Sequence, residues 1–111
     1  MMKKIYSIAP YSLSGVLVEL EANLSRHLPK IIIVGLPDAA VSEAKERVWA
    51  AIENSGFQFP RQKVVINLAP AQIRKEGGAY DLPIAVAVLV ANGDIKEVSH
   101  NYAFIGELSL N

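Results

Sequence analysis

The chain has 111 residues, which is enough for one domain built around a single hydrophobic core. Hydrophobic residues make up 51% of it, which excludes a disordered chain, and 11 basic residues balance 11 acidic ones, so the net charge gives no reason to expect nucleic-acid or membrane binding. The absence of cysteine excludes disulfides and thiolate zinc sites. We find no signal peptide, because polar residues and Pro10 interrupt the apolar stretch behind Lys3-Lys4, and we expect a cytoplasmic location.

The first third of the chain predicts three strands. A strand over residues 3–9 is expected to end at Pro10, and the alternation of apolar and polar residues over 15–24 predicts a second strand with one solvated face. These two strands are expected to pair as a hairpin or meander. The β-branched run over 30–34 is typical of a central strand.

The segment Gly35-Leu36-Pro37-Asp38 predicts the start of a helix, with proline near the first helical position and the acid placed favourably for the helix dipole. Apolar residues then recur at helical spacing and define its buried face: Val41, Ala44, Val48 and Ile52. Glu43 and Arg47 can pair one turn apart, and Gly56 is expected to end the helix.

A later apolar run predicts the helix around which the rest of the chain packs. It follows a β-branched strand over 63–68, and its ten apolar residues, 82–91, are too few to span a bilayer, which needs about 20. Asp81 offers an N-cap oxygen, Pro83 fits the first turn and Gly93 fits the position after the C-cap. A helix over 82–92 that is apolar on all sides must be buried.

The segment from Tyr102 to Leu110 predicts a last strand, with Gly106 as a bulge or bend. The element order β-β-β-α-β-α-β predicts a single α+β two-layer domain over residues 1–111, with one mixed sheet and both main helices on one face. The last strand resembles half of a hairpin, so we expect this domain to be an N-terminal fragment truncated at its C-terminal hairpin.

The loop before the buried helix is the first candidate site. It brings Lys75, Glu76, Gly77, Gly78 and Asp81 to the helix N-terminus, where the glycines permit close backbone approach and the lysine can reach a phosphate or carboxylate. The alternative is a surface turn. Asp81 can act as a general base or as an N-cap, and we favour the N-cap. No G-x-x-x-x-G-K-[ST] motif occurs, so we expect this chain alone not to hydrolyse ATP.

A local basic segment is the second candidate. Between Glu53 and Glu76 the sequence has no acid, and its cations include Arg61, Lys63, Arg74 and Lys75. These four side chains can contact a phosphate backbone or an acidic partner. The alternative is a solvated face.

Other chemistry-bearing residues predict no site. His27 and His100 have no second histidine or cysteine at ligand spacing, so we expect no metal site. No serine lies in a nucleophile-elbow motif. We interpret Trp49, the only tryptophan, as core or interface packing.

Several linked motifs resemble a known family. In chain order they are residues 33–38, 41–48, 54–57, 66–71, 75–78, 81–83 and 106–108. Over nearly the whole chain they resemble the N-terminal domain of the ComM/YifB family of magnesium-chelatase-like AAA+ ATPases.

The resemblance implies a ribosomal protein S5 domain 2-like fold, shared with the Lon proteolytic domain, with a left-handed β-α-β crossover in place of the usual right-handed one. It also implies an AAA+ module farther along the polypeptide, in a hexameric DNA helicase that promotes branch migration during natural transformation. ATP and Mg are then expected for the full-length protein, with no cofactor in this part. The expected partners are the AAA+ module, further copies of the protein and DNA, but no membrane.

The Lon comparison also bears on catalysis. Lon proteases carry Lys-Asp-Gly-Pro-Ser, whose serine is the nucleophile; here Lys75-Glu76-Gly77-Gly78-Ala79 occupies the matching stretch. Ala79 has no nucleophilic atom. We therefore expect a non-catalytic accessory domain of an AAA+ DNA motor, acting in subunit assembly, DNA engagement or both. The alternatives are a Lon-like serine peptidase with a displaced nucleophile and a magnesium-chelatase subunit.

Overall fold

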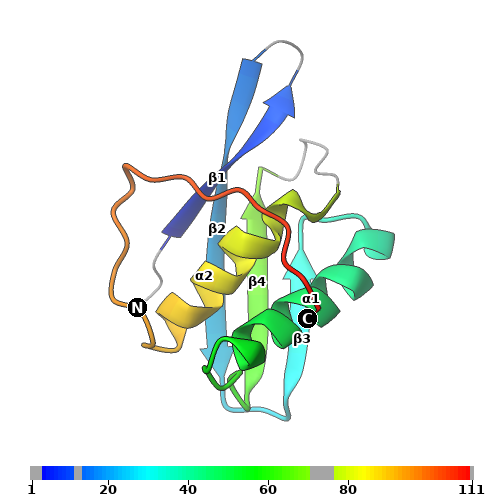
Figure 1. The fold of residues 1–111 in the computed structure, drawn as a ribbon, viewed down its shortest axis with the longest axis vertical. Coiled ribbons are helices and arrows are strands. Elements are labelled where there is room, and N and C mark those ends of the chain that lie inside the picture. The colour runs from blue at the N-terminus through cyan, green and yellow to red at the C-terminus, as the bar shows by residue number, and fades with distance from the viewer. Residues whose placement is uncertain (1–3, 12–13, 71–76, 111) are drawn as a thin grey trace.

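A computed structural model describes residues 4–11, 14–70 and 77–110 of the chain. Within them, one mixed sheet carries two α-helices on the same face, as the sequence predicts (Figure 1). The elements in chain order are β1 (Lys4–Tyr11), β2 (Ser14–Ser25), β3 (Lys30–Val34), α1 (Asp38–Asn54), β4 (Lys63–Ala69), the 3-10 helix η1 (Gly77–Tyr80) and α2 (Asp81–Ala91).

The predicted hairpin is confirmed. β1 and β2 pair antiparallel, with Ile5 opposite Leu20. The prediction that Pro10 ends the first strand is wrong, because β1 continues to Tyr11 and Pro10 lies opposite Gly15. β1 is an edge strand of the described sheet, and proline is tolerated there because one side of an edge strand donates no ladder hydrogen bonds.

The strand order in the described sheet is β1-β2-β4-β3. The prediction of a central strand over 30–34 is therefore wrong, because β3 lies at an edge. β4 occupies the place between β2 and β3, antiparallel to the first and parallel to the second. A β-branched run fits a buried strand at either place, so its composition does not determine the order.

The connection from β3 through α1 to β4 has an uncommon hand. In Figure 1 both strands run upward, α1 lies in front of the sheet, and β4 lies to the left of β3. A path that rises behind, descends in front and moves left is a left-handed turn. Such crossovers are rare among parallel β-α-β units, and this one agrees with the expectation from the resemblance.

The first helix follows its sequence signals closely. Pro37 occupies the N-cap of α1, and the predicted inner face is buried at Ala44, Val48 and Ile52. Gly56 adopts a φ of +92°, and the N–H groups of Gly56 and Phe57 donate to Glu53 and Ile52 carbonyls. This is the Schellman arrangement expected of a helix-ending glycine.

The second helix is the buried centre of the domain. Eight of the 11 residues of α2 are buried, and α2 packs against β1, β2, β4 and α1. Pro83 lies in its first turn, and Gly93, with a φ of +82°, follows its C-cap. These three predictions are confirmed.

The predicted last strand is not formed within the described residues 102–110. This segment instead crosses α2 (Figure 1) and makes scattered backbone hydrogen bonds: Phe104 N–H donates to Tyr6, Gly106 N–H donates to Ala79, and Leu82 N–H donates to Gly106. Gly106 is thus not a bulge in a strand. A strand needs a neighbouring ladder, and these partners come from three different elements.

One buried polar atom in β1 carries a stability prediction. Ser7 is 0% exposed, and its Oγ has no hydrogen-bond partner among the described residues. Because an unpaired buried hydroxyl loses its water without compensation, Ser7→Ala is expected to raise the free energy of unfolding by about 1 kcal/mol. Urea denaturation of both proteins measures this, and a loss of stability in the variant would show that the hydroxyl has a partner after all.

Candidate functional site

The N-terminus of α2 contains a buried ion pair. Arg47 of α1 donates from Nε to Asp81 Oδ2 at 2.5 Å and from Nη2 to Asp81 Oδ1 at 3.2 Å. The Asp81 side chain is only 2% exposed, and that of Arg47 is 18% exposed. The hydrogen bond to Asp81 is the main cause that raises the pKa of Arg47. The pair ties the two helices together.

Asp81 also holds the C-terminal segment in place. Its Oδ2 accepts the backbone N–H of Leu108 at 3.1 Å. The prediction that Asp81 is the N-cap is wrong: Tyr80 occupies the N-cap, no described side chain caps the helix, and Asp81 is its first residue. With both oxygens engaged and the residue 1% exposed, the carboxylate offers no access to a substrate proton.

Part of the candidate loop can be placed. Gly77 and Gly78 lie in η1, whereas Lys75 and Glu76 fall outside the described residues. Gly78 is buried, and a Cβ there would collide with the side chain of Glu107. The described half of the loop is therefore covered by residues 106–108, a contact that no sequence signal revealed.

Two of the four predicted basic residues can be placed. Arg61 is exposed and lines a pocket of about 350 Å³, and Lys63 begins β4. Lys63 lies opposite Lys30 in the parallel register of β3 and β4. Arg74 and Lys75 fall outside the described residues, so the predicted group of four stays a prediction.

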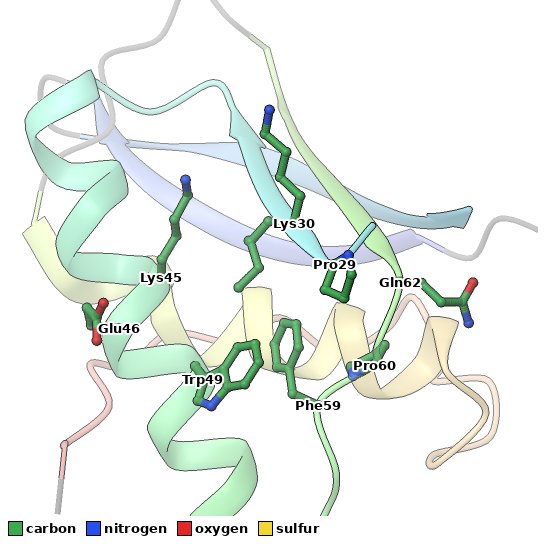
Figure 2. A pocket seen from close by; sticks show the side chains of 9 residues that line it. Pro29, Lys30, Lys45, Glu46, Trp49, Phe59, Pro60 and Gln62 are labelled. Carbon is green, nitrogen blue, oxygen red and sulfur yellow. The ribbon is translucent and has the colours of Figure 1, made fainter. Parts of the chain in front are cut away.

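A larger pocket adjoins this basic segment. It has a volume of about 440 Å³ and lies between α1, the start of β3 and the segment before β4 (Figure 2). Lys30 and Lys45 line it together with Trp49, Phe59 and other residues. The sequence analysis missed both lysines, because they come from separate elements and no local pattern joins them.

Trp49 is not a core residue. Its side chain stacks on Phe59, with ring centroids 4.6 Å apart and planes inclined by 20°, yet the residue is 45% exposed. The two predicted roles of Trp49 were core packing and interface packing. The structure excludes the first, and the second stays a prediction. Its place on the outer half of α1 follows from helical spacing, since it adjoins the buried Val48.

Neither histidine belongs to a metal-ligand group among the described residues. His27 Nδ1 lies 3.2 Å from Ser25 Oγ, and the ring of His100 meets Tyr6 edge-on. No group of three potential His, Cys, Asp or Glu ligands occurs within residues 4–11, 14–70 and 77–110. In the same ranges, no helix is both long enough and apolar enough to cross a bilayer.

Comparison with known proteins places the chain in a family. Residues 20–111 match the family model described as subunit ChlI of Mg-chelatase. The chain is 49% identical to the protein YifB of Salmonella typhimurium over 94 residues. This match covers 84% of the chain and 19% of YifB. It is 42% identical over 108 residues to the competence protein ComM of Haemophilus influenzae, which covers 96% of the chain and 21% of ComM.

The same comparisons show how much of each relative's length the chain spans. A Mycobacterium tuberculosis relative, Rv2897c, is 41% identical over 108 residues, or 22% of its length, so the chain spans about a fifth of the curated relatives it matches. The resemblance seen in the sequence motifs is confirmed. The chain therefore belongs to the Mg-chelatase ChlI-like family that includes YifB and ComM.

Proposed function

We propose that this chain is the non-catalytic N-terminal accessory domain of an AAA+ ATPase that acts on DNA. Family membership supports this, as does the match of most of the chain to about a fifth of much longer relatives. One of those relatives is named a competence protein, which fits the expected role in natural transformation. The remaining four fifths of the full-length protein would then carry the ATP-dependent motor, with ATP and Mg as its cofactors.

The observation that carries this proposal is that hydrogen bonds within the domain occupy the Asp81 carboxylate. The described residues in and beside the stretch that matches Lon serve the fold: the Ala79 carbonyl accepts the Gly106 N–H, and Asp81, two positions beyond that stretch, binds Arg47 and Leu108. A general base needs a free oxygen within reach of the proton that it removes. This arrangement favours a structural role over the peptidase alternative.

The finer fold assignment belongs to the same proposal. A ribosomal protein S5 domain 2-like fold is supported by the mixed sheet, the two helices on one face and the left-handed crossover. In the full-length protein the domain would contact the AAA+ module of its own polypeptide and neighbouring copies in a hexamer in the cytoplasm.

The full-length protein tests the accessory role. Removal of residues 1–111 is expected to lower ATP-dependent DNA unwinding or hexamer formation while leaving the Walker motifs in place. Unwinding and assembly that are unchanged by this removal would contradict the proposal. The peptidase alternative would instead be established if the full-length protein cleaved peptides without ATP and lost this activity when residues 1–111 were removed.

The placed basic residues give a separate prediction for DNA contact. Replacing Arg61 and Lys63 by alanine in the full-length protein is expected to weaken DNA binding and to flatten the plot of log affinity against log salt by about 0.7–0.9 per lost phosphate contact. Anisotropy titrations at several salt concentrations measure both effects. Lys96→Ala, at an exposed lysine outside the basic segment, is the matched control, and equal salt slopes in all proteins would remove these contacts.

A further inference from the structure

The 440 Å³ pocket beside β3 combines an aromatic surface with cations. Figure 2 shows Trp49 and Phe59 at one side of the pocket, and the Lys30 and Lys45 side chains extending from separate elements on the other side. Among the described residues, Glu46 is the only acid that lines it. The volume lies within the range of sites that hold small ligands or single nucleotide units.

The aromatic surface is held rigidly. Phe59 is 2% exposed and supports one face of the Trp49 indole, which itself stays 45% exposed. The backbone N–H of Phe59 donates to Glu53 Oε2 at 2.6 Å, which fixes the segment before β4 against α1. A half-exposed indole backed by a buried ring provides a flat apolar platform without loss of side-chain freedom on binding.

The cations at this pocket have no anionic partner in the described part of the chain. The ion pairs found there involve Lys4 and Arg47, not the pocket-lining Lys30 and Lys45, nor Lys63 beside Lys30. Lys30 and Lys63 lie directly opposite each other in neighbouring strands, where like charges repel. Arg61 lines the adjoining pocket, which shares Phe59, Pro60 and Gln62 with the larger one. A bound anion would relieve this repulsion.

We propose that this pocket binds single-stranded DNA, with one base stacked on Trp49 and the flanking phosphates contacting Lys30 and Lys45. Stacking platforms within basic grooves are how proteins bind single strands without sequence preference. Duplex DNA does not fit, because each of its bases is already stacked on both faces. An acidic peptide would use the lysines but not the platform. The inference rests on the proposed action on DNA and names the form of DNA that this domain contacts.

Oligonucleotide binding by the 111-residue chain tests the proposal. A labelled dT12 is titrated by fluorescence anisotropy, and the Trp49 emission is followed in parallel, since this is the only tryptophan. We expect dT12 to bind and to quench Trp49. Trp49→Leu is expected to weaken binding about tenfold, and Lys45→Gln is expected to flatten the salt slope by about 0.7. Lys45 lies outside the buried face of α1, so its variant keeps the core intact and the test informative if Trp49→Leu fails to fold.

Matched arms identify the source of binding. Lys96→Gln, the control, should bind as the unchanged chain does, and equal binding by Lys45→Gln and Lys96→Gln would place the contact elsewhere and overturn the proposal. If duplex DNA competes for the chain as well as dT12 does, the proposed stacking of a base on Trp49 is overturned. Free dTMP that binds as tightly as dT12 would make the pocket a nucleotide site and overturn the strand assignment. Absence of dT12 binding overturns this inference alone, because the effect of removing residues 1–111 on unwinding and assembly is measured separately.

Discussion

Replacing Asp81 by asparagine is expected to lower the free energy of unfolding by about 3 kcal/mol, because it leaves the partly buried Arg47 without its buried counter-charge. The asparagine side chain keeps the shape of the carboxylate and can still accept the Leu108 N–H. The loss therefore reports on the charge and not on packing. Urea denaturation followed by Trp49 fluorescence measures the change, since α1 carries both Arg47 and the only tryptophan.

Glu43→Gln is the matched control for this prediction. Glu43 contacts the same Arg47 at 3.5 Å, but its side chain is 76% exposed. An exposed pair on a helix is worth about 0.3–0.5 kcal/mol, so this variant should stay within that range. The double variant Arg47→Met with Asp81→Asn should lose less than the sum of the single changes, because no unpaired charge remains. Equal losses for Asp81→Asn and Glu43→Gln would contradict a buried structural pair.

Gly35→Ala is expected to lower the free energy of unfolding by about 3 kcal/mol. Gly35 joins β3 to α1 with a φ of +106°, and a Cβ there would collide with the carbonyl oxygen of Leu68 in the central strand β4. The backbone of a central strand cannot yield as a flexible side chain can. The substitution must therefore shift the strand or the start of the helix, and urea denaturation measures the resulting loss.

Gly56→Ala separates the two causes. Gly56 has a similar φ of +92°, but no atom of the described residues lies within 4 Å of a Cβ built on it. It should lose only about 1 kcal/mol, the cost of the left-handed conformation for an L-residue. If both alanine variants lose the same amount, the collision with Leu68 contributes nothing, and backbone conformation alone explains the requirement for glycine at position 35.

The helices and most strands could be predicted because their signals are local. Gly56 and Gly93 end their helices through hydrogen bonds to residues three to five positions away. The all-apolar composition of α2 predicts its burial at the centre, since no orientation of such a helix suits water. The strand predicted over Tyr102 to Leu110 was wrong because that prediction also used only local pattern. The pattern favours a strand, but no neighbouring strand pairs with this segment in the described structure.

The candidate site was only partly predictable. Asp81 was singled out correctly as a residue of the α2 N-terminus, but its assignment as an N-cap was wrong, because Arg47 competes for the carboxylate more strongly than backbone N–H groups do. Lys30 and Lys45 went unnoticed beside Trp49, since they come from a strand and a helix that meet only after folding.

The sequence by itself determined the family, the α+β class, the helix ends and the buried helix, because these follow from motifs and from interactions within a few residues. Only the tertiary structure decided that β4 lies between β2 and β3, that Asp81 pairs with Arg47 34 positions away, and that lysines from two elements line one pocket with Trp49. Strand order and side-chain partners depend on contacts between distant segments, which local propensity does not encode.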